Sequence, residues 1–438
     1  MNHFASDRQG GSDAGIARLA GPLRTPDDLD RLLERIGNAR IVLLGEASHG
    51  TAEYYLWRAA LSRRLIAEHG FSFVAVEGDW PDCFRVNRWA GDRADRDLTA
   101  VDVLGRYERW PRWMWANEEV AAFLGWLREH NERSGADVGF YGLDVYSLWD
   151  SMHAVIDYLA KQRPEALDTA REAYACFEPY GQDPQRYARA TRLVPTSCED
   201  EVVAVLADLR RISGTLDEDP EAGLDARQNA EVMAGAERYY RAMVAADARS
   251  WNIRDHHMAD TLDRLLAHRG PRAKAIVWEH NTHVGDARAT PMAGRGMVNV
   301  GQLVRQHHEA DGVVIVGFAG YRGSVNAADA WGTAAECLTV PPAPRGTHEA
   351  LLHEALGEPS VLVFPDRRDS GWLAESCGHR AIGVVYHPEA DEFANWVPTV
   401  MGRRYDALCF FDDTGAVHPL HRESAHPGAE QEAWPSGR

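Results

Sequence analysis

The sequence predicts an α/β fold in which a largely parallel central sheet is flanked by helices. Short apolar segments typical of buried strands alternate with segments of helical periodicity in the first part of the chain, and similar strands recur in its last part. Between them, residues 148–267 carry Ala, Arg, Glu and Leu at helical spacing and contain no convincing strand. We therefore expect one sheet built from both parts of the chain, with an inserted helical lobe that covers its active-site edge.

The first part of the α/β core is expected over residues 22–147. It follows a polar leader at residues 1–21, whose Gly, Ser and Asp residues offer little to bury. The segment PDDLDRLLERIG has acidic residues in its first turn and a terminal Gly, which predicts a helix. The elements expected after it are a strand at 41–44, a helix at 51–68, a strand at 73–76, a helix at 81–89 and a strand at 142–144.

The second part of the core is expected over residues 268–423, where apolar segments bounded by polar turns resume. A polar tail rich in Pro and Gly follows at residues 424–438. The strands expected in this second part lie at 275–278, 313–317, 361–364, 382–386 and 407–411.

Composition restricts the class of partner. A chain of 438 residues is long enough for one large core and an appended lobe. Its net charge of −19 disfavours nucleic acid and anionic membrane surfaces, so we expect a small-molecule substrate. No apolar run is long enough to span a bilayer, and the N-terminus lacks the apolar stretch of a signal peptide. These observations predict a cytoplasmic protein; they leave its oligomeric state open.

The six cysteines are scattered singly and never form a C-x-x-C pair. This spacing indicates neither a zinc ribbon nor a disulfide framework, so we expect reduced thiols. The cysteines are Cys83, Cys176, Cys198, Cys337, Cys377 and Cys409.

Charged or imidazole side chains follow several of the expected strands at the point where each strand ends. The carboxyl ends of parallel strands lie along one edge of a sheet, so these groups are expected to converge on a single cleft. Burial and neighbouring charges at such a rim shift pKa values toward catalytic use, which predicts an enzyme. The residues concerned are His49, Glu77, Asp144, His280 and His283.

The loop Gly45-Glu46-Ala47-Ser48-His49-Gly50 is the first candidate site. Ser48 does not fit the G-x-S-x-G pattern of a serine nucleophile, so a role as helix N-cap is favoured for it. His49 alone would more often be structural, but Glu46 and Glu77 are both expected within reach of it. An imidazole held by a carboxylate is a typical general base at neutral pH.

His280 and His283, in the segment WEHNTHVGD, form the second candidate site. Their spacing fits either a pair of ligands for Zn²⁺ or Mn²⁺ or two histidines that transfer protons, and a structural role for one of them stays open. Arg58 lies on the apolar stripe of the helix at 51–68. It is expected either to extend its head to the helix edge or to turn it toward Glu46, Glu77 or an oxyanion.

An aromatic cluster supplies the candidate substrate-binding residues Trp80, Trp110 and Trp113. Tryptophans at this density pack in a core or line the wall of a pocket for a large apolar ligand. Asp79 beside them either attracts a cationic amine on such a ligand or serves in a turn or an N-cap.

Five ordered motifs together resemble the erythromycin esterase family: GEASHGTAEYY, FVAVEGDWPD, FYGLDVYSLWDSM, RDHHMADTLD and WEHNTHVGDA. The similarity extends from about Arg24 to His421 and includes RAIGVVYHP and RRYDALCFFDDTGAVHPLH.

The resemblance implies hydrolysis of a macrolactone ester by water, without a covalent acyl-enzyme, and hence macrolide resistance. It implies His49 as the base, with Glu46 and Glu77 holding the base or the water. It also implies an essential pair at His280 and His283, a required Arg58, and Arg254 near the substrate.

No cofactor is required by this mechanism, and the resemblance leaves dependence on a metal open. A divalent metal, if present, would be held by the two glutamates and three histidines of these motifs, Glu46, Glu77, His49, His280 and His283.

Two alternatives remain beside the macrolide esterase. One is a hydrolase for a different ester, such as an acyl group on a polysaccharide, because the walls of a cleft rather than shared motifs decide the substrate. The other is a module that binds a metal or haem without catalysis.

Overall fold

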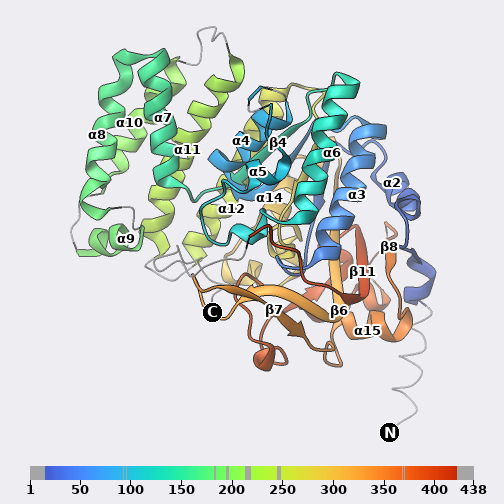
Figure 1. Cartoon of the computed structure of the whole chain (residues 1–438). Helices are drawn as coiled ribbons and strands as arrows, with labels where there is room; N and C mark the ends of the chain where they lie inside the picture. Colours follow the sequence, from blue (N-terminus) through green and yellow to red (C-terminus); the bar gives the residue numbers. More distant parts are fainter. Residues whose placement is uncertain are drawn as a thin grey trace. The chain divides into compact units, whose positions relative to one another are not determined.

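A computed structural model describes residues 15–91, 93, 94, 96–181, 184–193, 197–212, 219–243, 248–366, 368 and 370–421. They form two compact units (Figure 1). Unit 1 contains the described residues up to Val74, Asp97–Val138 and those from Ala273 onward; unit 2 contains Ala75–Arg96 and Gly139–Arg272.

The core of unit 1 is a mixed, mostly parallel sheet. Its central strands pair in parallel. Strand β2 lies between β5 and β6 and is parallel to both, and β11 is parallel to β6. Antiparallel strands complete it: β8 pairs with β11, β1 with β8, and β7 with β6. Along the sheet the strands are β1 (Ala20–Pro22), β8 (Ser360–Val363), β11 (Ala407–Thr414), β6 (Val313–Ala328), β2 (Ile41–Leu44) and β5 (Ala275–Trp278), with β7 (Ala335–Val340) on β6.

Every residue of β2 and β5 is buried, which is why these strands appear in the sequence as continuous apolar runs rather than alternating ones.

The principal helices of unit 1 begin and end at recognisable signals. Asn117 caps the start of α6 by accepting from the Val120 amide, and α3 ends at Gly70 in the left-handed conformation. These helices are α2 (Asp30–Ile36), α3 (Ala52–His69), α5 (Ala100–Leu104), α6 (Glu118–Ser134), α13 (Asn281–Val284), α14 (Val300–His307), α15 (His348–Ala355) and α16 (Met401–Arg404). A separate two-stranded sheet joins β9 (Ser376–Arg380) to β10 (Trp396–Val400).

Unit 2 is mainly helical. Strand β3 (Phe73–Asp79) enters it from unit 1 and lies beside β4 (Gly139–Asp144), and a side chain at Gly142 would overlap the Gly78 carbonyl oxygen. Helices α4 (Trp80–Ala90) and α12 (Ala248–Arg269) pack on β4. The remaining helices share one apolar core (Figure 1). They are α7 (Leu148–Gln162), α8 (Leu167–Phe177), α9 (Pro184–Leu193), α10 (Glu199–Ile212) and α11 (Pro220–Met243).

The α/β fold predicted from the sequence is confirmed, and the described residues of the segment 148–267 are mostly helical, with no strand among them. The strand predicted at 382–386 is wrong. Ile382 and Val385 form only isolated bridges, to Ser48 and Ala328. The alternating apolar residues arise because Ile382 and Tyr386 pack into a small cluster with Val325 and other buried residues. Burial alone therefore produced the strand-like pattern.

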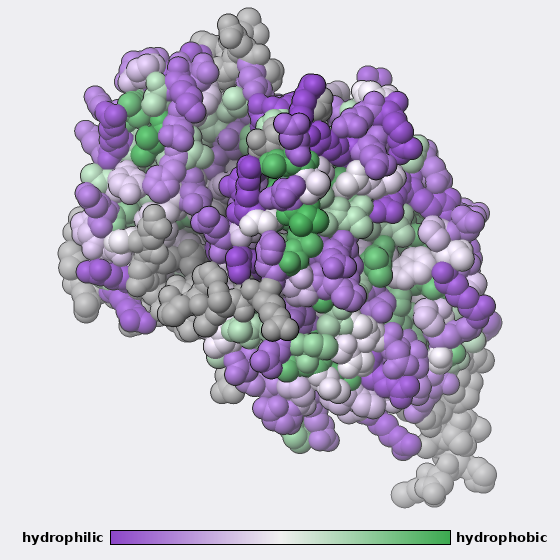
Figure 2. Space-filling view, viewed as in Figure 1, coloured by the Kyte–Doolittle hydropathy of each residue, from purple (hydrophilic) through white to green (hydrophobic). Residues whose placement is uncertain are grey.

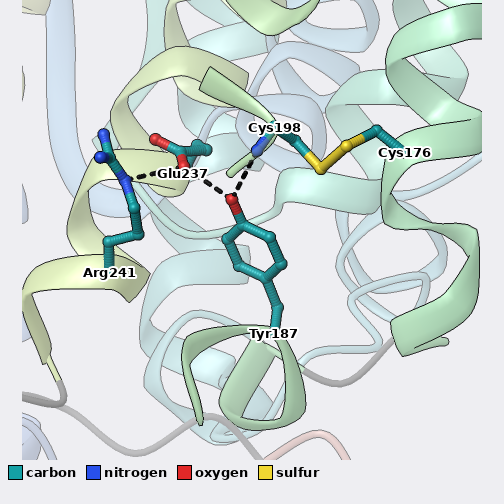
Figure 3. The surroundings of a disulfide bond; sticks show 5 residues. All are labelled: Cys176, Tyr187, Cys198, Glu237 and Arg241. Atoms are coloured by element: carbon teal, nitrogen blue, oxygen red, sulfur yellow. Dashed lines mark hydrogen bonds and ion pairs between the residues drawn. A yellow bond between two sulfur atoms is a disulfide. The ribbon is translucent and has the colours of Figure 1, made fainter. Parts of the chain in front are cut away.

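The prediction that all cysteines are reduced is also wrong, because Cys176 and Cys198 form a disulfide (Figure 3). Cys176 lies near the end of α8 and Cys198 lies just before α10, and these two helices pack together. The pair is separated by 22 residues, a spacing without any sequence motif. Tyr187 lies beside it: its hydroxyl accepts from the Cys198 amide (3.0 Å) and donates to Glu237 (2.6 Å).

Figure 2 shows one face of the molecule, on which hydrophilic side chains predominate and hydrophobic ones gather in groups between them. Within the described ranges, no helix has the length and apolar character needed to cross a membrane.

Candidate active site

The loop after β2 is shaped by two glycines that allow close approach of other chain segments. A Cβ atom at Gly45 would lie 2.0 Å from the side-chain oxygen of Asn281, and one at Gly50 would lie 1.9 Å from the Asn326 carbonyl oxygen. No larger residue fits at either position without displacing these segments. The glycines therefore fix the path of the loop that carries Glu46 and His49.

Glu46 joins two of the predicted catalytic residues. Its carboxylate lies 2.8 Å from Nδ1 of His49 and 2.6 Å from Nη2 of Arg58, and all three side chains are buried. A carboxylate only accepts, so His49 donates through Nδ1, which leaves Nε2 as the basic nitrogen. Of the two neighbours predicted for His49, Glu46 is therefore in contact with it.

Arg58 is fully buried, so its head does not extend to the helix edge. Its Cζ atom lies 4.4 Å from the ring centre of Tyr55 and 5.2 Å from that of Trp278. The aromatic faces and the Glu46 carboxylate together compensate the buried positive charge.

Ser48 is not the N-cap of α3. That position belongs to Thr51, and the Ser48 hydroxyl forms its hydrogen bond with the Thr51 hydroxyl. The turn at Gly50 delays the start of the helix beyond Ser48, which is why the prediction missed by three positions.

His280 faces His49, with their ring centres 4.9 Å apart. Its Nδ1 accepts from the Thr282 amide (3.3 Å) and lies 2.8 Å from the Thr282 hydroxyl, so the imidazole N–H is on Nε2. Burial, assisted by the neighbouring His49 and His283, holds the pKa of His280 well below its usual value. His280 is therefore a neutral hydrogen-bond donor, and the buried His283 follows it on α13.

The described residues contain no group of three or more His, Cys, Asp or Glu side chains placed to hold a metal ion. Two members of the predicted ligand set, Glu46 and His49, are instead bonded to each other. No chemical step is therefore assigned to a metal.

The chain segment after β5 contains two buried residues that were not predicted as site residues. Glu279 is fully buried directly before His280, and Asn281 bonds through its amide to Phe318 on β6. Their position in the sequence could have indicated a role at the site, since both lie in the polar segment WEHNTH immediately after an apolar strand.

In unit 2, Arg254 holds two of the other strand-end carboxylates. Its guanidinium donates to Asp144 through Nε (3.0 Å) and Nη2 (2.8 Å), and through Nη2 to Glu77 (2.8 Å). The Tyr146 ring lies over the guanidinium, with 4.9 Å between its centre and Cζ. Arg254 thus pairs with both buried carboxylates and fixes their positions. Its predicted substrate contact, and a role for Glu77 at His49, stay predictions.

Trp80 packs in the core of unit 2. It is stacked between Phe84 and Tyr141 and donates from Nε1 to Asp225 (2.8 Å). Burial raises the pKa of Asp225 to about 7. Asp79 is buried at the position before α4, without a side-chain bond to the helix amides. For these two residues a contact with substrate stays a prediction.

Trp110 and Trp113 belong to unit 1. Trp110 is buried against Trp331 and donates to the Thr333 carbonyl oxygen (3.0 Å). Trp113 lies at the wall of a cavity of about 520 Å³. The residues that line this cavity are Trp113, Asn326, Ala334, Ala335, Glu336, Cys337, Pro419 and His421.

Hydrogen bonds connect the walls of this cavity to the His49 loop. The Asn326 amide donates to the Gly50 carbonyl oxygen (3.0 Å). The Tyr55 hydroxyl lies 2.8 Å from the His49 carbonyl oxygen and 2.7 Å from that of Met114, the residue after Trp113. The cavity therefore adjoins the loop that carries the candidate base.

Comparison with known proteins identifies the class. The family model of erythromycin esterase matches residues 66–414, and the chain belongs to this family. Erythromycin esterase type II of Escherichia coli is 31% identical over 162 residues, which span 36% of this chain and 36% of that relative. The putative hydrolase YbfO of Bacillus subtilis is 20% identical over 82% of this chain and 84% of its own length. The protein is accordingly a hydrolase of this family.

Solved structures show the same fold at low sequence identity. A protein from Bacillus cereus superposes with a TM-score of 0.75 at 19% identity, covering 94% of this chain and 99% of its own. A succinoglycan biosynthesis protein gives a TM-score of 0.74 at 21% identity with the same coverage. A mutant of the erythromycin esterase EreC in its open conformation gives 0.68 at 17% identity, covering 91% and 97%.

Replacing Arg58 by Met is expected to lower the free energy of unfolding by about 3–5 kcal/mol, because Glu46 would stay buried without its partner. Urea unfolding measures this change. Arg64→Met on the same helix is the control, since the Arg64–Glu68 pair is partly exposed and such pairs contribute about 0–1 kcal/mol. Equal losses in the two variants would contradict the assignment.

His257 on α12 makes the stability of unit 2 depend on pH. Burial lowers its pKa from 6.5 to about 3, so below pH 6.5 the unfolded chain binds a proton that the folded chain does not. Stability is fully present above pH 6.5 and is lost by about 1.4 kcal/mol per pH unit as pH falls toward 3.

In His257→Gln, the difference in unfolding free energy between pH 7.5 and 5.0 should therefore shrink by about 2 kcal/mol, as measured by urea titration. The exposed neighbour His256 provides the control variant His256→Gln, which should keep the wild-type difference. A His257→Gln protein with the wild-type difference would refute the prediction.

Proposed function

We propose that the protein hydrolyses a carboxylic ester with water activated by His49, and that a macrolide lactone is the first substrate to test. The Glu46–His49 hydrogen bond carries this proposal. It orients the imidazole and stabilises its protonated form, as a general base requires. Membership of the erythromycin esterase family supports the ester and the lactone.

In the proposed reaction, His49 Nε2 removes a proton from a water molecule as its oxygen attacks the ester carbonyl carbon. His280, neutral and with its N–H on Nε2, would donate a hydrogen bond to the oxyanion that forms, in exchange for its hydrogen bond with the Ala47 backbone. When the tetrahedral intermediate collapses, the carbon–alkoxide bond breaks and protonated His49 returns the proton to the alkoxide. The products are an acid and an alcohol, which for a lactone is one ring-opened molecule heavier by one water.

The Ser48 hydroxyl, already bonded to Thr51, has no bond to His49 that would activate it as a nucleophile. This arrangement supports direct attack by water rather than a covalent acyl-enzyme.

An acyl ester on a polysaccharide is the second candidate substrate. One similar structure is described as a succinoglycan biosynthesis protein. Trp113 and the cavity beside the His49 loop are the proposed binding surface in either case, because a volume of about 520 Å³ suits a small-molecule ligand.

Replacing His49 by Gln is expected to lower kcat by about 10² to 10⁴, the typical contribution of a general base. The purified protein would be incubated with erythromycin, with and without chelator, and the hydrated product quantified by mass spectrometry. His387→Gln, at an exposed position, is the control for loss of a histidine. A His49→Gln protein that folds and keeps most of its rate would remove His49 from the mechanism. If wild type gives no product, simple acyl esters and acylated polysaccharides become the substrates to test.

Cys337 offers a chemical test of the cavity, because it is an exposed free thiol at the cavity wall. Alkylation with N-ethylmaleimide is expected to raise KM for erythromycin by about 10-fold, which corresponds to about 1.4 kcal/mol of lost binding. Erythromycin should in turn slow the alkylation of Cys337, as followed by peptide mass spectrometry. Cys337→Ala should keep its KM after the same treatment. Unchanged KM in alkylated wild type would place the substrate elsewhere.

A further inference from the structure

The side chain of Asn281 extends the sheet beyond the end of β2. Its Nδ2 donates to the Phe318 carbonyl oxygen (2.7 Å) and its Oδ1 accepts from the Phe318 amide (3.3 Å). The preceding backbone hydrogen bond between the β2 segment and β6 runs from the Gly45 amide to the Val316 carbonyl oxygen (2.9 Å), two residues before Phe318. The amide of Asn281 thus takes the place of the next residue of a strand, passing over the α-carbon of Gly45.

A buried imidazole supplies a third partner for this amide. Nε2 of His379 on β9 lies 3.3 Å from Asn281 Nδ2, and its Nδ1 lies 2.6 Å from Oε1 of Glu349 on α15. The same carboxylate oxygen accepts from the Arg380 amide (2.9 Å). His379 and Glu349 are 1% and 0% exposed, so substrate does not reach them.

The donors and acceptors in this chain of contacts have one consistent arrangement. Oε1 of Glu349 faces both Nδ1 of His379 and the Arg380 N–H, so this carboxylate is the acceptor in both contacts. His379 then donates through Nδ1, and its Nε2 is left as an acceptor for the second N–H of the Asn281 amide. This arrangement agrees with the amide orientation that the Phe318 backbone selects, in which Nδ2 faces the carbonyl oxygen and Oδ1 faces the N–H.

Asn281 connects both loops of the candidate active site. Its backbone amide donates to the Glu46 carbonyl oxygen (2.8 Å), and its carbonyl oxygen accepts from Arg404 (2.8 Å). It directly follows His280, whose ring faces His49. A rotation of Asn281 would therefore move Glu46 and His280 relative to each other.

We propose that Glu349, His379 and Asn281 form a positioning relay that fixes the relative placement of the His49 loop and the His280 turn. The proposal rests on the function proposed above. Glu349 sets the tautomer of His379, the Nε2 acceptor of that tautomer reinforces the amide orientation that the Phe318 backbone selects, and the amide holds both loops against β6. A displacement of about 1 Å between reacting groups can cost about 10² in rate, so loss of the relay is expected to lower kcat.

Two substitutions of His379 separate this relay from simple core packing. His379→Asn keeps a donor near the Nδ1 position for Glu349 but gives Asn281 no acceptor. His379→Gln places an amide oxygen near the Nε2 position, which restores the acceptor. With erythromycin, or the best ester found for wild type, kcat is expected to fall at least about 10-fold in His379→Asn, with KM within about 2-fold. The loss in His379→Gln should be several-fold smaller.

His348 provides the matched control. It is equally buried and precedes Glu349, but its Nε2 contacts the Thr399 carbonyl oxygen (2.9 Å) instead of Asn281. His348→Asn should therefore keep the wild-type kcat, whatever it does to thermal stability. Equal loss of kcat in His379→Asn and His379→Gln, or unchanged kcat in His379→Asn, would overturn the relay.

A spectroscopic measurement tests the relay without any substrate. In protein with ¹⁵N-labelled histidine, the His379 resonances, assigned as those lost in His379→Asn, should show a neutral ring protonated at Nδ1. Glu349→Gln should reduce the population of that tautomer. An Nε2-protonated or doubly protonated His379 in wild type would overturn the relay, even if the ester hydrolysis proposed above were correct. Failure to hydrolyse any ester, with the Nδ1 tautomer present, would instead overturn only the proposed function.

Discussion

The buried carboxylate of Glu46 is the interaction on which the candidate site depends. A carboxylate without access to water is strongly destabilising unless it is paired and hydrogen-bonded. Arg58 supplies the opposite charge and His49 supplies a second donor, each at hydrogen-bonding distance. Because Glu46 needs both partners, it fixes where the imidazole lies and which of its nitrogens is basic. Stability and the proposed chemistry therefore rest on the same three side chains.

The sheet keeps this group in place through close backbone approach. Gly45 lets the Asn281 amide cross over the chain to β6, and Gly50 lets the loop return to pair with Asn326. Side chains at these two positions would separate the loop from β6. The His280 turn is held against the same strand by Asn281, so both histidine-bearing segments share one rigid support.

Unit 2 also contains buried carboxylates that are paired with a buried arginine. Arg254 pairs with Glu77, which lies within β3, and with Asp144, which ends β4. One guanidinium pairs with both buried carboxylates there, as Arg58 pairs with Glu46 in unit 1. The Cys176–Cys198 disulfide cross-links the helices farther along the same unit, away from any motif in the sequence.

The sequence by itself determined the α/β class, the mainly helical nature of the described part of residues 148–267, and the family. Apolar runs that are buried on both faces, separated by helical periodicity, admit few other folds. It also marked His49 and Glu46 as neighbours, because both lie in one short loop after a buried strand. These features are local, so their physical causes are visible within a few residues of sequence.

Only the tertiary structure decided the long-range partners. The disulfide between Cys176 and Cys198, the burial of Ile382 without a strand, and the contact of His379 with Asn281 each join segments whose spacing carries no periodic signal. Such contacts depend on how helices and strands pack, and packing selects among many sterically allowed pairings. A pattern along the chain therefore reveals which residues must be buried, but not which distant group will satisfy them.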